Sequence, residues 1–322
     1  MIIDVYKNYV FDYLDLLSQI RLLATCWTLR NGLDITDMYN IPYKYRRRIT
    51  QSIIDRYINL EKLDASDNAK ITNVNHLDKL EILDAEFYCG INDAGIVQCI
   101  NLKSLNASHN QNITTVNHLI KLEILDASYN CGINDTGIVQ CVNLKSLNAS
   151  DNSKITNVNH FAKLEILDAS YNCGINNAGI VQRINLKSLN ASYNRKITNV
   201  NHLVKLEILE VHNDGGINDA GIVQCINLKS LNALNNRKIT NVNHLVNLEI
   251  LNAFGGCGIN DAGIVQCINL KSLNASNNRK ITNVNHLVNL EILNAFGGCG
   301  INDAGIVQCI NLKSLNASNN RK

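Results

Sequence analysis

Cysteine and histidine are the side chains of this sequence that could bind a metal ion or act as nucleophiles, and most of them recur at a fixed interval. The sequence contains 11 cysteines and 8 histidines. Ten cysteines form two columns whose members lie 42 residues apart or a multiple of 42, and six histidines form a third. The three columns are Cys89, Cys131, Cys173, Cys257 and Cys299; Cys99, Cys141, Cys225, Cys267 and Cys309; and His76, His118, His160, His202, His244 and His286.

This interval argues against chemistry within a column. If the intervening coils stack as parallel strands about 4.8 Å apart, two neighbours in a column lie roughly 10 Å apart. A disulfide needs Cα atoms within about 7 Å of each other, and the bonds of a metal such as zinc are about 2 Å long. We therefore expect small buried cysteines and histidines that pack in turns, with no metal and no cofactor.

Two breaks in the repeat are the places where an active site could differ from its surroundings. Glu210, Val211 and His212 replace an Asp-Ala-Ser triplet, and Arg183 replaces a column cysteine. Glu210 and His212 resemble an acid–base pair, but no glycine-rich phosphate loop, metal-spaced cluster or nucleophile motif accompanies them. We expect that the protein is not an enzyme.

The interval arises from an internal repeat. Residues 228–269 recur in the next 42 residues with one change, Leu234 against Ser276. The leucines that open successive coils are separated alternately by 20 and 22 residues, which is typical of a solenoid. These leucines are Leu60, Leu80, Leu102, Leu122, Leu144, Leu164, Leu186, Leu206, Leu228, Leu248, Leu270, Leu290 and Leu312.

The 20-residue coil has the pattern L-x-x-L-x-A-x-x-N-x-x-I-T-x-V-x-x-L, which resembles the leucine-rich repeat. The 22-residue coil contains C-x-I-x-D-x-G-I, which resembles the cysteine-containing subtype of that repeat. The resemblance implies an α/β fold, a leucine-rich-repeat solenoid over residues 59–322, with a parallel β-sheet on the concave face and short helices and turns on the convex side. It also implies a buried asparagine that bonds backbone groups of its own and the adjacent coil. This ladder asparagine is Asn68, Asn110, Asn152, Asn194, Asn236, Asn278 and Asn320.

Two charged columns have structural interpretations. An aspartate precedes the short apolar helix expected in most 22-residue coils, where its carboxylate would cap free N–H groups. The residue after the opening leucine alternates between Glu and Lys, so neighbouring strands would pair opposite charges. The aspartates are Asp93, Asp135, Asp219, Asp261 and Asp303, with Asn177 in the remaining copy.

The outward-facing residues of the strands form the candidate site for a protein partner. Residues beside the second leucine of each coil alternate outward from the sheet. The central column is acidic in the first half of the array and neutral in the second, one flank alternates Ile with Ser, and the other carries Phe in later coils. The alternative interpretation is that these columns only solvate and shield the sheet. The candidate residues are Asp84, Asp126, Asp168, Ile124, Ile166, Ile208, Glu210, His212, Phe254 and Phe296.

Residues 1–58 do not repeat. We expect a helical segment over residues 1–45 and a capping helix over residues 46–58, whose apolar face would cover the first strand of the array. The stretch YVFDYLDLLSQIRLLATCWTLRN resembles an F-box. Together with the cysteine-containing coils it resembles the F-box and leucine-rich-repeat proteins of giant amoeba-infecting DNA viruses (mimivirus-like).

That resemblance implies a non-catalytic receptor, the substrate-recognition subunit of a Skp1–cullin–F-box ubiquitin ligase, which holds its target on the concave face. The alternative is a free-standing leucine-rich-repeat scaffold whose N-terminal helices only cap the array. Carried over from the family, the positions that would contact the Skp1-type adaptor or support that contact include Val10, Leu14, Leu16, Ile20, Leu23, Cys26 and Trp27.

Charge and hydropathy bear on the remaining partners and on location. A net charge of +2 gives no reason to expect a nucleic-acid or membrane partner. No apolar stretch approaches the ~20 residues of a membrane span, and the acidic N-terminus does not resemble a signal peptide. We expect a cytoplasmic location, in the host cytoplasm if the protein is viral. The last coil stops at Lys322 without a polar cap, which predicts some end-to-end self-association.

Overall fold

The computed structural model describes residues 14, 18, 19, 35–39 and 41–322. The chain divides into two compact units, Met1–Leu144 and Lys145–Lys322. In both units the repeating element is a coil of 20 or 22 residues that contains one three-residue strand. No helix among the described residues is long and apolar enough to cross a membrane.

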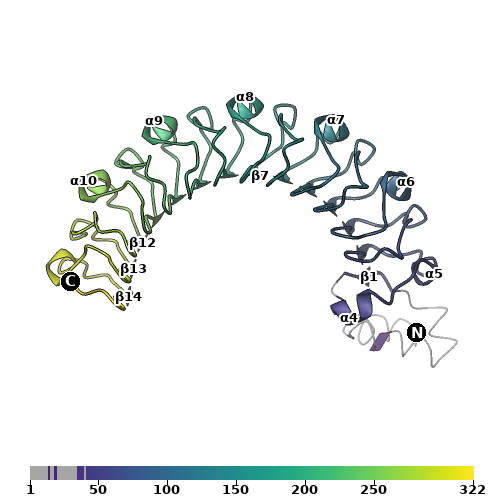
Figure 1. The fold of residues 1–322 in the computed structure, drawn as a ribbon, viewed down its shortest axis with the longest axis horizontal. Coiled ribbons are helices and arrows are strands. Elements are labelled where there is room, and N and C mark those ends of the chain that lie inside the picture. Colours follow the sequence, from purple (N-terminus) through teal and green to yellow (C-terminus); the bar gives the residue numbers. More distant parts are fainter. Residues whose placement is uncertain (1–13, 15–17, 20–34, 40) are drawn as a thin grey trace, which may run out of the picture. The chain divides into compact units, whose positions relative to one another are not determined.

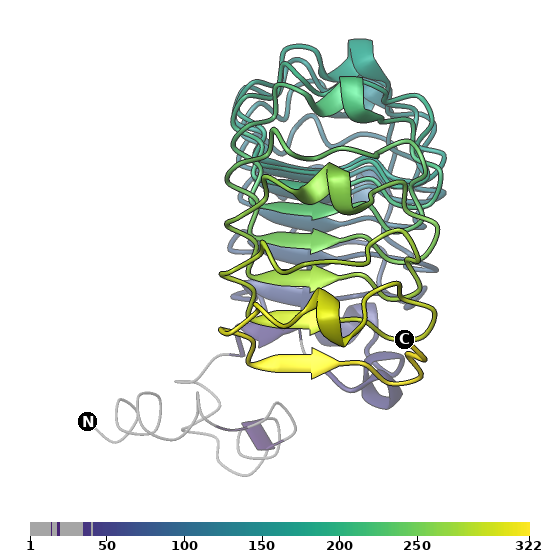
Figure 2. The same ribbon diagram turned by 90° about the vertical axis from the view of Figure 1, so that its left-hand side faces the viewer.

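The strands of each unit are parallel and pair in chain order, so that neighbours in sequence are neighbours in the sheet (Figure 1). In Figure 2 the strands of the second unit that are drawn in green and yellow lie side by side and point the same way. The first unit contains β1 (Asp37–Met38), β2 (Lys62–Asp64), β3 (Ile82–Asp84), β4 (Ser104–Asn106) and β5 (Ile124–Asp126). The second contains β6 (Ser146–Asn148), β7 (Ile166–Asp168), β8 (Ser188–Asn190), β9 (Ile208–Glu210), β10 (Ser230–Asn232), β11 (Ile250–Asn252), β12 (Ser272–Asn274), β13 (Ile292–Asn294) and β14 (Ser314–Asn316).

Single-turn helices of the 22-residue coils lie on the side of each unit opposite to the strands (Figure 1). The glycine in these helices is required by close packing, because a Cβ at Gly179 would lie 2.1 Å from the carbonyl oxygen of Thr156. The helices are α6 (Asp93–Ile96) and α7 (Asp135–Ile138) in the first unit, and α8 (Asn177–Ile180), α9 (Asp219–Ile222), α10 (Asp261–Ile264) and the 3-10 helix η2 (Asp303–Gly305) in the second.

The leucine-rich-repeat pattern places its apolar residues inside the coil. The middle residue of each strand in the array is a leucine that faces the core, and Leu83 pairs with Leu105 in parallel register with 1% of each exposed. This confirms the expected stacking of the two kinds of coil. Full burial of a leucine side chain contributes roughly 2 kcal/mol, so stability comes from many equivalent contacts between successive coils.

The ladder asparagine is buried and bonded as predicted. In the second unit Asn194 is 1% exposed, and its Nδ2 donates to the carbonyl oxygens of Ala169 at 2.7 Å and Ile175 at 3.1 Å. Its Oδ1 accepts the backbone N–H of Lys196 at 2.8 Å. One side chain therefore satisfies two carbonyls of the preceding coil and one N–H of its own coil, and each such group would be costly to bury without a partner.

The predicted aspartate cap is wrong. The residue that caps each helix is the preceding asparagine: Asn134 has extended backbone geometry, and its Oδ1 accepts the N–H of Gly137 at 3.0 Å. The aspartate is instead the first helical residue and bonds the next coil, as Asp93 does by accepting the N–H of Thr114 at 2.7 Å. The residue at the N-cap position needs a β-region backbone conformation and a short side chain that can accept a hydrogen bond. The asparagine of the Ile-Asn-Asp motif meets both conditions.

The cysteine and histidine columns have the structural roles expected of them. The ten described cysteines that are free are all buried, and burial raises the pKa of the Cys99 thiol to about 12. The Sγ of Cys99 donates to the carbonyl of Val74. Nε2 of His118 lies 2.9 Å from the carbonyl oxygen of Ile96, so this column bridges turns of successive coils. Arg183, which replaces a cysteine, is 7% exposed and its Nε has no partner.

The start of the array is covered differently from the prediction. Instead of one helix over residues 46–58, the structure has two single-turn helices, α4 (Tyr43–Arg46) and α5 (Gln51–Ile54). A two-residue strand, β1, pairs in parallel with β2. Ile54 is fully buried, and the carbonyls of Arg46 and Ile49 accept from Nδ2 of Asn68. The segment therefore takes the place of a preceding coil by bonding the first ladder asparagine.

The strand at the other end of the second unit, β14, pairs with β13, and all three of its residues are exposed. Leu315 is 46% exposed, whereas the equivalent leucines of preceding strands are buried. End-to-end self-association through this coil stays a prediction.

Replacement of the ladder asparagine tests its role in stability. We expect Asn194→Ala to lower the free energy of unfolding by about 3 kcal/mol, because two buried carbonyls and one N–H lose their partner. The measurement is urea unfolding followed by circular dichroism.

Asn172→Ala is the matched control. Asn172 stands at the corresponding position of the 22-residue coil, is exposed, and bonds Asp151. We expect its replacement to change stability by less than about 0.5 kcal/mol. Equal effects of the two substitutions would contradict the assigned role of the ladder.

Candidate functional site

The candidate site is the outward side of the strands, and its residues form rows because the strand register is constant. In the first unit, Ile82, Ser104 and Ile124 are register partners on β3, β4 and β5. In the second unit the same row alternates from Ile166 to Ser314. The last residue of each strand forms a second row of Asp, Asn or Glu. This confirms the predicted alternation of the face.

The isoleucines of the first row are half-exposed. The exposed fractions are 50% for Ile124, 51% for Ile166 and 45% for Ile208. Ile250 and Ile292, which belong to the same row, are 51% and 49% exposed. Because Ser alternates with Ile in this row, isoleucines of one row lie two strands or about 10 Å apart.

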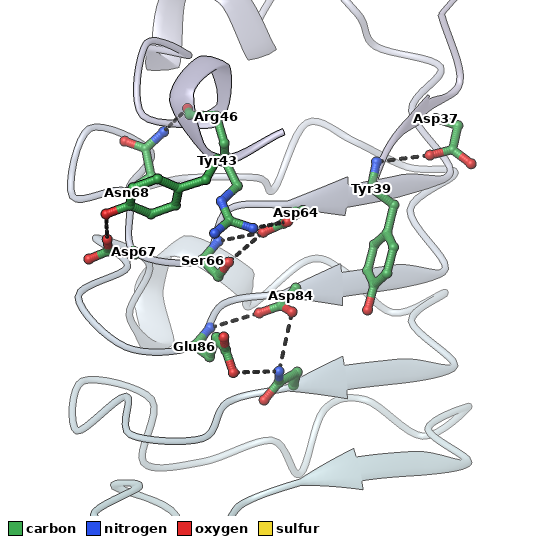
Figure 3. A network of polar contacts seen from close by, with 11 residues as sticks. Asp37, Tyr39, Tyr43, Arg46, Asp64, Ser66, Asp67, Asn68, Asp84 and Glu86 are labelled. Carbon is green, nitrogen blue, oxygen red and sulfur yellow. Dashed lines mark hydrogen bonds and ion pairs between the residues drawn. The ribbon is translucent and has the colours of Figure 1, made fainter. Parts of the chain in front are cut away.

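An acidic cluster occupies the strand ends of the first unit (Figure 3). Asp84 accepts from Nδ2 of Asn106 at 3.2 Å, and Glu86 accepts from the same nitrogen at 3.0 Å. The pKa of Asp84 is raised to about 6, mainly by burial and also by the charges of Glu86 and Asp64, while the hydrogen bonds from the Glu86 backbone and Asn106 oppose the rise. A carboxylate this close to others and partly removed from water is harder to ionise.

The carboxylate at the end of the adjoining strand β2, Asp64, is neutralised by an arginine of the N-terminal segment. Asp64 forms an ion pair with Arg46 of α4 and accepts the N–H and the hydroxyl of Ser66 (Figure 3). The N-terminal residues also reach the next turn, where the hydroxyl of Tyr43 donates to Asp67 at 2.8 Å. The acidic character available to a partner therefore comes from Asp84 and Glu86 more than from Asp64.

The second unit begins with the same kind of pairing and then loses its acids. Asp168 accepts from Nδ2 of Asn190 at 3.0 Å. Glu210 lies 3.7 Å from Nε2 of His212, and its interaction with this side chain lowers the pKa of the Glu210 carboxyl. From β10 onward the corresponding residues are all asparagine. Phe254 and Phe296, which follow β11 and β13, are half-buried beside them.

The opposite edge of the strands carries the predicted charge pairs. In the first unit Lys103 lies 2.7 Å from Glu81. In the second unit the corresponding Lys–Glu pairs have separations of 2.9 Å: Lys187–Glu165, Lys229–Glu207, Lys271–Glu249 and Lys313–Glu291. All of these side chains are solvent-exposed to a substantial degree, so we interpret them as guides to strand register.

A row of aromatic rings at the other loop edge was missed by sequence reasoning. In the first unit Phe87, His109 and Tyr129 stack with ring centroids 4.8 and 4.3 Å apart. In the second unit Tyr171 and Tyr193 stack at 4.9 Å. These residues have positive φ, which is unusual for bulky side chains. Their 20- and 22-residue spacing was visible in the sequence, but the turn geometry that aligns the rings was not.

A groove of about 900 Å³ lies beside the rings of the second unit. Its lining includes Tyr193, Arg195, Asp214 and Arg237. The lysines that follow these arginines are already engaged, as Nζ of Lys196 donates to the carbonyl of Cys173 at 3.2 Å. The groove therefore combines aromatic edges with charges of both signs.

The adaptor-binding site predicted from the F-box resemblance stays a prediction, because most of its residues lie outside the described part of the chain. Of the seven, only Leu14 is described; it is half-buried, and its carbonyl accepts from Gln19 at 3.2 Å. Val10, Leu16, Ile20, Leu23, Cys26 and Trp27 lie outside the described residues.

The possible ligand and acid–base side chains of the described residues are scattered. No group of three or more His, Cys, Asp or Glu among them could hold a metal ion. Glu210 and His212, which resemble an acid–base pair in the sequence, lie 3.7 Å apart on the open strand face and are partly exposed to solvent. The rows of this face instead provide shape, apolar contact and hydrogen-bonding groups.

No protein-family model matches the sequence, and no curated protein matches it either. Solved structures do match the fold. An internalin (InlF) from Listeria monocytogenes superposes with a TM-score of 0.60 and 20% sequence identity over 84% of this chain and 83% of that chain. The functional domain of InlJ from Listeria monocytogenes, which includes a cysteine ladder, matches with a TM-score of 0.50 and 18% identity over 82% of this chain and 64% of that chain.

These likenesses and the strand order define the class of fold. The chain is an α/β leucine-rich-repeat solenoid, mostly parallel sheet with short helices, as the repeat pattern predicts. At 18–20% identity they concern the fold alone. The activity and the partner must therefore be argued from the chain's own residues.

Replacement of Asp84 tests the electrostatics of the acidic cluster. Its folded-state pKa of about 6 lies above the ordinary value of 3.8, so the folded state binds this proton more tightly than the unfolded state. Stability is therefore lost as the pH rises from about 4 to about 6. We expect Asp84→Asn to be more stable than the wild type by about 2 kcal/mol at pH 7.5.

The pH dependence provides the control for this variant. Below pH 4 Asp84 is protonated in both states, so the difference in unfolding free energy between variant and wild type should shrink toward zero. Urea unfolding at pH 3.5, 5 and 7.5 measures it. A difference that is independent of pH would contradict the assigned pKa.

Proposed function

We propose that the outward strand face is a binding surface for another protein. The observation that carries the proposal is the row of half-exposed isoleucines, Ile124 in the first unit and Ile166, Ile208, Ile250 and Ile292 in the second. The fold does not need apolar residues there, because serine occupies the same row on every intervening strand. Apolar side chains kept at solvent-exposed positions that tolerate serine are best explained by a partner that covers them.

The geometry of the face favours a macromolecular partner over a small molecule. Consecutive strands extend the rows along each unit, so the surface is long and open. Burial of the exposed half of one isoleucine contributes about 1 kcal/mol. Several rows engaged together would give a useful affinity, which is how repeat scaffolds bind extended partners.

Two finer roles remain within this proposal. In one, the chain is the substrate-recognition subunit of a Skp1–cullin–F-box ubiquitin ligase of the mimivirus-like kind, acting in the host cytoplasm. Its support is the resemblance of residues 9–31 to an F-box and the absence of enzymatic motifs from the repeats. In the other, the chain is a free-standing scaffold and residues 35–58 only complete the array, as the contacts of Asn68 illustrate.

The isoleucine row can be tested with a matched control. The triple variant Ile166→Ser, Ile208→Ser and Ile250→Ser places on these strands the residue that the intervening strands already carry. A photoreactive residue introduced at Asn190 reports binding by cross-linking to the partner protein. We expect the triple variant to reduce the yield of these cross-links at least about tenfold, because the apolar contact is removed.

The control replaces Val181, Val223 and Val265 with serine. These valines lie in the short helical turns, away from the strands, and are 53%, 46% and 46% exposed, close to the values for the isoleucines. Cross-linking should survive in this control. Equal loss in both triple variants, or no loss in either, would argue against the strand face as the binding surface.

The adaptor hypothesis predicts a separate interaction. We expect a purified Skp1-type adaptor to bind the full chain, and Leu14→Glu combined with Trp27→Ala to weaken that binding at least tenfold without affecting the cross-links at the strand face. Surface plasmon resonance measures the first effect. Absence of adaptor binding by the unaltered chain would favour the scaffold role.

A further inference from the structure

The last strands of the second unit present hydrogen-bond donors without matching acceptors. The side chains concerned are Asn232, Asn252, Asn274 and Asn294, which end β10 to β13. Each Oδ1 accepts the backbone N–H of the residue two positions later, at 3.3, 3.2, 3.1 and 3.3 Å respectively.

This bond determines the orientation of each amide. A backbone N–H can only donate, so the oxygen of the carboxamide must face it and Nδ2 must point elsewhere. Among the described residues none accepts a hydrogen bond from Nδ2 of these four asparagines. Because neighbouring strands lie about 4.8 Å apart, the face carries NH₂ groups at that spacing along the row.

Earlier strands use the same position differently. Nδ2 of Asn106 in the first unit donates to Asp84 and Glu86. Nδ2 of Asn190 in the second unit donates to Asp168. Asp84 and Asp168 are each the last residue of the preceding strand. The strands that precede β11, β12 and β13 end in asparagine and provide no carboxylate, and Glu210, the register partner of Asn232, interacts with His212 instead.

The four asparagines, here called the donor row, are flanked on both sides by apolar side chains interspersed with serines such as Ser272 and Ser276. Ile250 and Ile292 lie in the neighbouring row, and they are 51% and 49% exposed. Leu234, Phe254 and Phe296 follow the asparagine strands on the other side and are half-buried. The second unit also has an excess of positive charge, with 17 Lys and Arg against 11 Asp and Glu in residues 145–322.

We propose that β10 to β13 bind an extended acidic peptide segment of a partner protein, whose carboxylates supply the acceptors that this row lacks. The inference rests on the proposed function of the strand face and adds the chemistry of the partner. One carboxylate has two oxygens and would accept from two neighbouring asparagines. Successive carboxylates would therefore repeat every two strands, or about 10 Å.

That repeat matches one conformation of the ligand. A polyproline II segment advances about 3.1 Å per residue, so every third residue lies on one side at intervals of about 9.3 Å. The expected segment carries an acidic residue at every third position and apolar residues between, which would contact the isoleucine and phenylalanine side chains. Phosphates of a nucleic acid fit less well, because the donor row is uncharged and such binding depends on cations that neutralise phosphates.

The test uses a fluorescein-labelled peptide of four Asp-Leu-Pro triplets and the full chain. Fluorescence anisotropy should show binding of this peptide, and binding at least tenfold weaker for a peptide with Asn or Lys in place of Asp. The decisive variant is Asn252→Asp with Asn274→Asp, which we expect to weaken binding of the acidic peptide at least tenfold.

The fold itself provides the reason to expect that this variant folds. Aspartate stands at the same coil position in Asp168, where its Oδ1 accepts the N–H of Ser170 as asparagine does. The control is the double variant Asn199→Asp with Asn172→Asp. Both residues are exposed and lie outside the strands, so the added charge is the same. Equal loss in both double variants would show an effect of net charge only and overturn the proposal.

The outcomes separate this inference from the proposed function. If the acidic peptide fails to bind the unaltered chain, or if an oligonucleotide of eight thymidines competes for the asparagine row, the inference is overturned. The cross-links that depend on Ile166, Ile208 and Ile250 would in that case still test the strand face independently. If those cross-links are also absent, the proposed function fails with it.

Discussion

The buried asparagine of the 20-residue coil is the interaction on which the repeat architecture depends. Backbone carbonyl groups of the preceding coil lie buried beside this side chain. Asn194 satisfies two of them in the preceding coil and one N–H in its own. Asn68 makes the same kind of bonds to the N-terminal segment, although that segment is not a repeat. The side chain must hold both a donor and an acceptor and must be short, which leaves asparagine as the suitable residue.

The interior residues hold successive coils together, so the residues of the outward rows can vary without disturbing the fold. The central leucines of β2 to β13 are all 0–1% exposed, whereas the last residue of the strand is Asp, Asn or Glu in the earlier coils and Asn alone from β10 onward. This change alters the hydrogen-bonding character of the face without altering its backbone. The amide of Asn190 pairs with Asp168, whereas the amide nitrogen of Asn252, which has asparagine on both neighbouring strands, is available to a partner.

The turn after each strand shows the same separation of structure from surface. The third residue after each strand from β2 to β14 has positive φ, yet it is Phe87 or Tyr129 in the first unit and Asn235 or Gly255 in the second. Glycine at Gly255 leaves room for the side chain of Asn235, whose Oδ1 would lie 2.3 Å from a Cβ there. Aromatic residues at such a position cost about 1 kcal/mol of backbone strain. Stacking between neighbouring rings offsets a cost of this size, since one aromatic pair contributes about 1 kcal/mol.

The sequence by itself determined the class of fold, the register and the interior. The 20- and 22-residue spacing of the leucines identifies coils that must stack in order, and the outward positions follow from the alternation of side chains along a strand. Three features were decided only by the tertiary structure. The strand β1 and the helices α4 and α5 do not belong to the repeat, and they form because the first coil needs a partner for Asn68. The helix cap belongs to Asn134 and not to Asp135, since backbone geometry selects between two adjacent acceptors. The orientation of the Asn252 amide is set by the backbone N–H of Phe254, which donates to its Oδ1. The sequence does not show which end of the amide faces the backbone, and this contact decides it.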